Sequence, residues 1–209
     1  MRLLVLLVLA AGACAADAAP RLVYSKYFKG STPESVVITV EQSGAATYRD
    51  APDDGDPLKF RVPDAAVAEM FALAAKLDHF QRPIESGLKV AQMGIKTFRY
   101  ENGAESHEAK FNYSLDADAR ALTDWFEKIT DTEESLMALD RDIHFDKLGV
   151  NRSLLNLEII YDHNRLIDPA QFFPLLERVA RNESFLHIDR ERAARLSEEF
   201  RRPKEKPAE

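Results

Sequence analysis

The chain has 209 residues, a formal net charge of −7, 45% hydrophobic residues and 30% charged residues. Eight glycines and ten prolines are too few for a collagen-like or low-complexity chain, and a single cysteine excludes a disulfide-stapled scaffold. The acidic balance disfavours a nucleic-acid partner, because binding to phosphates needs a clustered excess of Lys and Arg. The composition is that of a folded globular protein and does not by itself specify a biological task.

The N-terminal segment has the layout of a secretory signal peptide. Arg2 gives a positive start, residues 3–11 form an unbroken apolar run, and Ala16 and Ala18 suit a cleavage site. The apolar run is too short to span a bilayer, and no later stretch reaches the length of a membrane span. We therefore expect residues 1–18 to be removed and the mature protein to be secreted or periplasmic, without a membrane span.

Cys14, the single cysteine, allows a second interpretation of this segment. In a bacterial lipoprotein signal, which has a pattern similar to Leu-Ala-Gly-Cys, the cysteine becomes the lipid-modified first residue. Here Ala11, Gly12 and Ala13 precede Cys14, and the first two depart from that pattern. Soluble export is the favoured prediction, and a lipid anchor at Cys14 is the alternative.

Alternating hydrophobicity dominates the chain before residue 114. This pattern predicts strands over residues 21–28, 35–41, 45–49, 58–62, 95–101 and 104–113. Asn102 and Gly103 lie between the last two strands and tolerate positive φ, so they predict a two-residue hairpin turn. One helix interrupts the strands after residue 62, and Asp64 is its expected N-cap.

Helical periodicity replaces the alternation after Ser114. The pattern predicts five helices: one capped by Asp116, one over 132–145, one over 151–161, one opened by Asp168 and Pro169, and one capped by Asp189. Leu122, Trp125, Phe126 and Ile129 form one apolar stripe on the first of these helices. We expect this stripe to cover the sheet and Trp125 to be buried between the two halves of the chain.

Together these elements predict an α+β fold. An antiparallel sheet with one packed helix is expected over residues 19–113, followed by an all-helical half over 114–202 and a disordered tail over 203–209. The connection at 113–116 is short and lacks a Gly/Pro-rich linker, so we expect the halves to share an interface.

Four motifs follow one another between residues 22 and 113. They are Val-x-Ile-x-Val in the second strand, then Gly44-x-x-x-Tyr48, Phe80-x-x-Pro83 and Gly94-x-x-Thr97. Their order resembles that of uncharacterised secreted bacterial domains. The resemblance implies a bacterial envelope setting and implies no known activity.

No local pattern specifies catalysis or metal binding, so we assign no catalytic, cofactor or metal residue. Asp140 and His144 lie four apart on a predicted helix, but two ligands are fewer than the three of a catalytic zinc site. The loop at 50–56 places four carboxylates around Gly55, yet Pro52 occupies the third position of a calcium loop. We expect neither a metal nor an organic cofactor.

Three aromatic residues, Tyr24, Tyr27 and Phe28, gather at the start of the expected mature chain. The favoured interpretation is a central strand that is buried on both faces. The alternative is a strand with core on one face and a binding patch on the other.

Two classes of function remain open. The favoured one is a non-enzymatic exported envelope protein that binds a partner, and an unknown protein is the partner considered. The alternative is a cofactor-free hydrolase whose residues come from distant segments of the chain. A cleft with convergent polar side chains, or a flat apolar patch, discriminates between them.

Overall fold

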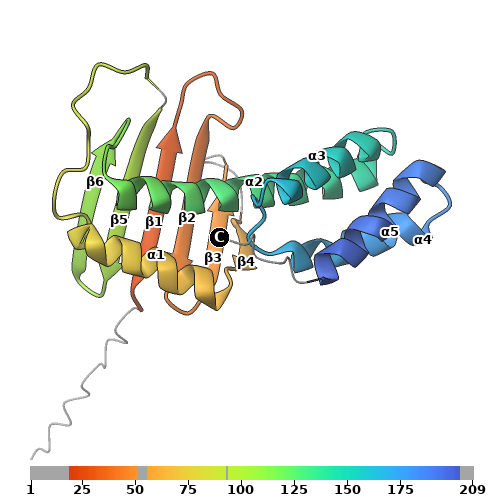
Figure 1. Cartoon of the computed structure of the whole chain (residues 1–209), viewed down its shortest axis with the longest axis horizontal. Helices are drawn as coiled ribbons and strands as arrows, with labels where there is room; N and C mark the ends of the chain where they lie inside the picture. The colour runs from red at the N-terminus through yellow and green to blue at the C-terminus, as the bar shows by residue number, and fades with distance from the viewer. Residues whose placement is uncertain (1–18, 51–55, 93, 203–209) are drawn as a thin grey trace, which may run out of the picture.

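The computed structural model of the protein describes residues 19–50, 56–92 and 94–202. It has an α+β fold, in which two helices cover one face of a six-stranded sheet and a lobe of helices extends beyond the sheet's edge (Figure 1). The predicted signal segment with Cys14, most of the acidic loop at 50–56 and the predicted tail lie outside the described residues.

All six predicted strands are confirmed. They are β1 (Arg21–Tyr27), β2 (Ser35–Glu41), β3 (Ala45–Arg49), β4 (Leu58–Arg61), β5 (Ile95–Asn102) and β6 (Glu105–Phe111). They pair antiparallel in the order β4-β3-β2-β1-β5-β6. The β5–β6 turn lies one residue later than predicted: Asn102 pairs with Glu105, and the loop is Gly103-Ala104. Gly103 takes the positive φ, 59°, that the first position of such a turn requires.

The helical elements are α1 (Asp64–Lys76), η1 (Asp78–Phe80), α2 (Ala117–Phe145), α3 (Val150–Asp162), η2 (Pro169–Phe172), α4 (Phe173–Arg181) and α5 (His187–Arg201). None of these described helices is long and apolar enough to cross a bilayer. Asp116 caps α2 and Asp168 caps η2, each by accepting hydrogen bonds from backbone N–H groups, as predicted.

Two of the expected caps are wrong. Asp64 is the first residue of α1 rather than its N-cap, and its carboxylate pairs with Arg61 at 2.8 Å. Asp189 lies inside the first turn of α5, fully buried, where it accepts a hydrogen bond of 2.6 Å from the amide of Asn151. In both cases a side chain outside the helix competes successfully with the helix's own N–H groups.

The helix α2 is continuous over 29 residues, where the sequence predicted one helix before residue 132 and another from 132 to 145. The hydroxyl of Thr132 does not cap a new helix, because it donates 2.7 Å to the carbonyl of Lys128 inside α2. At 1.5 Å per residue the helix is about 43 Å long. It therefore runs across the sheet and on into the helical lobe (Figure 1).

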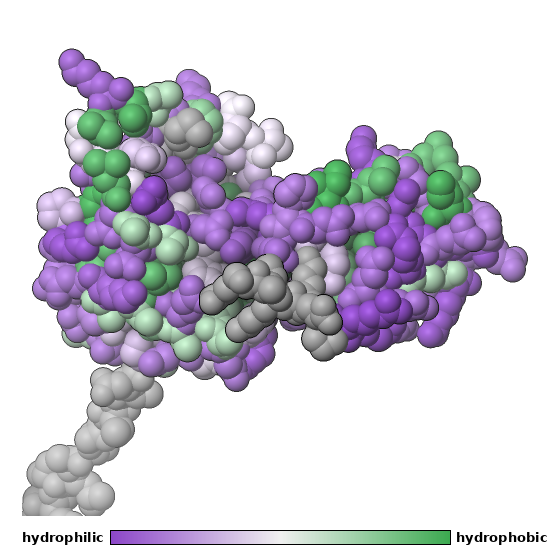
Figure 2. Space-filling model, in the orientation of Figure 1, coloured by the Kyte–Doolittle hydropathy of each residue, from purple (hydrophilic) through white to green (hydrophobic). Residues whose placement is uncertain are grey.

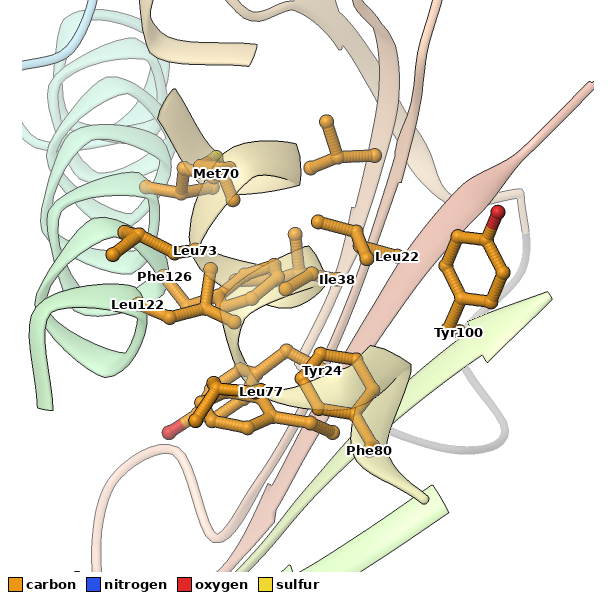
Figure 3. Packing of buried hydrophobic residues seen from close by; sticks show 14 of the residues in the cluster. Leu22, Tyr24, Ile38, Met70, Leu73, Leu77, Phe80, Tyr100, Leu122 and Phe126 are labelled. Atoms are coloured by element: carbon orange, nitrogen blue, oxygen red, sulfur yellow. The ribbon is translucent and has the colours of Figure 1, made fainter. Parts of the chain in front are cut away.

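Two apolar clusters hold the molecule together, and α2 contributes to both. The sheet core lies between the sheet, α1 and the first half of α2. Its largest members include Phe98 and, labelled in Figure 3, Tyr24, Ile38, Met70, Leu77, Leu122 and Phe126. The lobe core joins the second half of α2 to α3, η2, α4 and α5, and includes Leu139, Ile143, Leu154, Phe172, Leu176 and Leu196.

Only one face of the sheet is covered by described helices. In β1 the buried side chains of Leu22 and Tyr24 alternate with partly exposed ones, and Tyr27 is 52% exposed. The interpretation of β1 as a strand buried on both faces is therefore wrong. Tyr24 belongs to the sheet core, whereas Tyr27 lies on the open face.

Trp125 is partly exposed, so its predicted burial between the two halves is also wrong. It packs against the edge of the sheet core, with the ammonium nitrogen of Lys128 5.0 Å from the centre of its ring system. Phe126, the next residue, takes the buried position and is 1% exposed. Its ring stacks on that of Tyr24 with a centroid distance of 4.8 Å.

We expect Phe126→Ala to lower the free energy of unfolding by about 3–5 kcal/mol, because it removes a buried aromatic ring and leaves a cavity. Trp125→Ala should cost clearly less, because that side chain is only partly buried and already contacts solvent. Urea unfolding of the two variants measures both losses. Equal losses would contradict the burial described here.

Glu133 is a buried carboxyl where α2 leaves the sheet for the lobe. Gln171 donates a 3.3 Å hydrogen bond to Oε1, and Oε2 has no hydrogen-bond partner among the described residues. Burial, aided by the negative charge of Asp168, raises the pKa of Glu133 from 4.5 to about 7. The protonated form therefore fits this site better than the carboxylate.

Because the folded pKa of Glu133 exceeds its unfolded value, its contribution to stability is complete below pH 4.5 and is lost as the pH rises through about 7. We expect Glu133→Gln to flatten the fall in unfolding free energy between about pH 5 and pH 8. Urea unfolding across this pH range measures the change in unfolding free energy, and Glu183→Gln, at an exposed position, is the control. An unchanged pH dependence in Glu133→Gln would contradict a raised pKa.

Candidate functional site

A cavity of about 360 Å³ lies between the β1–β2 hairpin and α2, on the covered side of the sheet. Its first wall is the end of β1 with the loop that follows, its second wall is the middle of α2, and Arg165 closes it from the connection between α3 and η2. Three segments that are far apart in the sequence therefore meet at one place.

The periodicity of each wall explains which side chains face the cavity. In β1, Tyr24 and Lys26 lie on the covered face because side chains alternate along a strand. In α2, Glu127, Asp131 and Glu134 are four and three residues apart, so they share one face of the helix. This acidic face adjoins the apolar stripe, and the cavity opens at the border between them.

Tyr24 forms part of the cavity wall and is only 1% exposed. Its hydroxyl has no hydrogen-bond partner among the described residues. Burial raises the pKa of Tyr24, and the nearby carboxylate of Glu127 raises it further. A buried hydroxyl without a partner costs about 1–3 kcal/mol, and such groups are rare in folded proteins.

Tyr48 provides a useful contrast to Tyr24. It is equally buried, but its hydroxyl donates a 3.3 Å hydrogen bond to Oε1 of Glu134. Burial raises the pKa of Glu134, although this hydrogen bond from Tyr48 opposes the rise. Glu134 thus lines the cavity but already has a partner within the protein.

Two more charged side chains of the cavity are also paired. The guanidinium of Arg165 donates 2.6 Å hydrogen bonds to the carboxylates of Asp131 and Asp124. Two acids therefore compensate one base, and Asp131 and Arg165 form a paired part of the wall.

Lys26 and Glu127, in contrast, form no ion pair within 4.0 Å with any described residue. Lys26 extends from the sheet wall and Glu127 from the helix wall. Lys26 on β1 lies directly opposite Lys96 on the neighbouring strand β5. The ammonium group of Lys96 donates to the carbonyl of Asn112. Burial, and then the charge of Lys26, lowers the pKa of Lys96.

Two hydroxyl groups in the walls of the cavity, those of Ser31 and Thr130, face backbone carbonyls rather than bases. Ser31 donates to the carbonyls of Phe28 and Pro33, both at 2.7 Å, and Thr130 donates to that of Phe126 at 3.0 Å. Among the residues that line the cavity, Tyr24, Lys26 and Glu127 therefore carry polar groups that are not paired within the described protein.

No site residue is predicted from the sequence, and this cavity is not predicted from it either. Tyr24 is singled out there only as a member of an aromatic cluster. The available signal was Lys26, a charged residue at an inward position of a strand that is otherwise apolar on that face. Nothing local connects β1 with Glu127 on α2, because the two come together only when the helix crosses the sheet.

The Asp140–His144 pair lies on the exposed surface of the lobe. Nδ1 of His144 donates to the backbone carbonyl of Asp140, and Nε2 accepts from Arg178 at 2.9 Å. Within the described ranges, no group of three or more His, Cys, Asp or Glu side chains could hold a metal ion. The acidic loop at 50–56 cannot be compared, because residues 51–55 lie outside those ranges.

The helical lobe has green, hydrophobic patches on the face shown in Figure 2. The exposed large apolar residues of the lobe are Phe145, Leu148, Leu155, Ile159, Leu186 and Ile188. These residues are spread over the α2–α3 turn, α3 and the start of α5, and they share no cavity with the groups described above.

No protein-family model matches the chain, and no curated protein matches its sequence. The resemblance of residues 22–113 to secreted bacterial domains therefore stays a prediction.

We expect Tyr24→Phe to leave the unfolding free energy of the ligand-free protein unchanged or higher, because it removes a buried hydroxyl without a partner. Tyr48→Phe should lower it by about 0.5–1.5 kcal/mol, because it removes a hydrogen bond to Glu134. Urea unfolding of this matched pair measures the difference. A loss in Tyr24→Phe as large as that in Tyr48→Phe would show that the first hydroxyl has a partner.

Proposed function

We propose that the protein is an exported, non-enzymatic binding module whose cavity beside Tyr24 holds a small polar ligand. The observation that carries this proposal is Tyr24, a residue of the cavity wall whose fully buried hydroxyl lacks a hydrogen-bond partner among the described residues. Buried polar groups are almost always paired, so an unpaired one beside a cavity indicates the position of a missing partner. A ligand atom would supply that partner.

The dimensions and rigidity of the cavity support a small ligand. Its volume of about 360 Å³ falls within the range of small-molecule sites, which is roughly 300–1,000 Å³. Both main walls rest on the sheet core through the stacked rings of Tyr24 and Phe126. Such a preformed site loses little conformational freedom when a ligand binds.

Binding accounts for the polar groups of the cavity better than hydrolysis does. A hydrolase needs a nucleophile within hydrogen-bond reach of a base. The hydroxyls of Ser31 and Thr130 instead donate to backbone carbonyls. The proposal of export rests on the sequence alone, through the signal layout of residues 1–18.

A variant in which a bulky side chain fills the cavity tests this function. Thr32 lies in the exposed loop that lines the cavity, so Thr32→Trp should fill the cavity without disturbing the sheet core. Ala194→Trp, at an exposed position of α5, is the matched control. Thermal melts are recorded with pools of amino acids, sugars, organic acids and amines, because a ligand of the folded state raises the melting temperature.

We expect at least one pool to raise the melting temperature of the wild type and of Ala194→Trp, but not that of Thr32→Trp. A response that is the same in all three proteins would mean that the ligand binds elsewhere. No response to any pool would contradict the proposed function.

A further inference from the structure

We propose that the ligand of this cavity is a small zwitterion of the α-amino acid class, with its carboxylate on Lys26 and its ammonium group on Glu127. This inference rests on the proposed function and specifies the chemistry of the same cavity. It follows from which groups of the cavity are paired within the protein and which are not.

Two opposite charges face the same cavity without meeting. Lys26 comes from β1 and Glu127 from α2, and neither forms an ion pair within 4.0 Å with a described residue. A molecule with one positive and one negative group can pair with both at once. Each contact would be a charge-assisted hydrogen bond, which is roughly twice as strong as a neutral one.

The surroundings of Lys26 favour an anionic group at its end of the cavity. Lys26 lies opposite Lys96 in the register of β1 and β5, and like charges in this position destabilise a sheet. The other base that lines the cavity, Arg165, is already compensated by Asp124 and Asp131. A ligand carboxylate at Lys26 would relieve the repulsion between the two lysines.

The surroundings of Glu127 favour a cationic group. Of the three acids that line the cavity from α2, Asp131 holds Arg165 and Glu134 accepts from Tyr48, which leaves Glu127 unpaired. Glu127 is also the acid whose charge acts on the Tyr24 hydroxyl. An ammonium group between them would donate to both oxygens, so the unpaired hydroxyl gains its partner from the same ligand.

A ligand with only one charged group would pair with Lys26 or with Glu127, but not with both. A simple amine leaves Lys26 unpaired beside Lys96, and a simple carboxylate leaves Glu127 and the Tyr24 hydroxyl unpaired. A neutral sugar brings no opposite charge to either side chain. Complementarity with all three groups therefore selects the zwitterion.

The test uses matched probes in titration calorimetry with the whole mature protein. Each α-amino acid is compared with the amine that lacks its carboxylate and with the acid that lacks its ammonium group. We expect at least one amino acid to bind, and both of its matched analogues to bind at least about tenfold more weakly, because each loses one charged contact.

Two variants assign the contacts. We expect Lys26→Met and Glu127→Gln each to weaken binding of that amino acid by about tenfold or more. The control variants Lys29→Met and Glu69→Gln remove the same charges at exposed positions outside the cavity and should bind as the wild type does. Thermal melts without ligand check that every variant is folded.

The outcomes separate this inference from the proposed function. If an amine or an acid binds as tightly as its amino acid and Thr32→Trp abolishes that binding, the cavity is a binding site but not one for zwitterions. If Lys26→Met and Glu127→Gln bind an amino acid as the wild type does, the inference is overturned. If no amino acid binds, the inference falls, and the pool experiment then decides the proposed function separately.

Discussion

The continuity of α2 is the constraint on which the rest of the structure depends. Its first half closes the sheet core, where Phe126 stacks on Tyr24, and its second half supplies Leu139 and Ile143 to the lobe core. A break in the middle would separate these two cores. The helix therefore fixes both the cover of the sheet and the position of the lobe beside it.

The same helix determines the chemistry of the cavity. Its apolar stripe must face the sheet, and helical geometry then places Glu127 and Glu134 at the border of that stripe, opposite the end of β1. The fold accepts an unpaired hydroxyl on Tyr24 and adjacent positive charges on Lys26 and Lys96. Such local costs are typical of positions that function retains against stability.

Much of the fold could be predicted from the sequence, because the strands alternate with period two on a sheet with one open face. The continuity of α2 could not, since the pattern predicts a new helix that begins at Thr132, whereas the hydroxyl of Thr132 donates to the carbonyl of Lys128 within one helix. Asp189 likewise resembles a cap, but it turns inward to Asn151 on another helix. The cavity was beyond prediction because its walls have no local motif and meet only through tertiary packing.

A distance measurement along α2 shows whether the helix is continuous from the sheet to the lobe. Spin labels at Arg120→Cys and Arg141→Cys, both exposed positions, with Cys14→Ser, report the length of the helix between its two halves. A continuous α2 gives one narrow distribution that corresponds to about 31 Å between the two Cα atoms, at 1.5 Å of rise per residue. A broad or clearly shorter distribution would contradict a continuous helix and, with it, the fixed walls of the cavity.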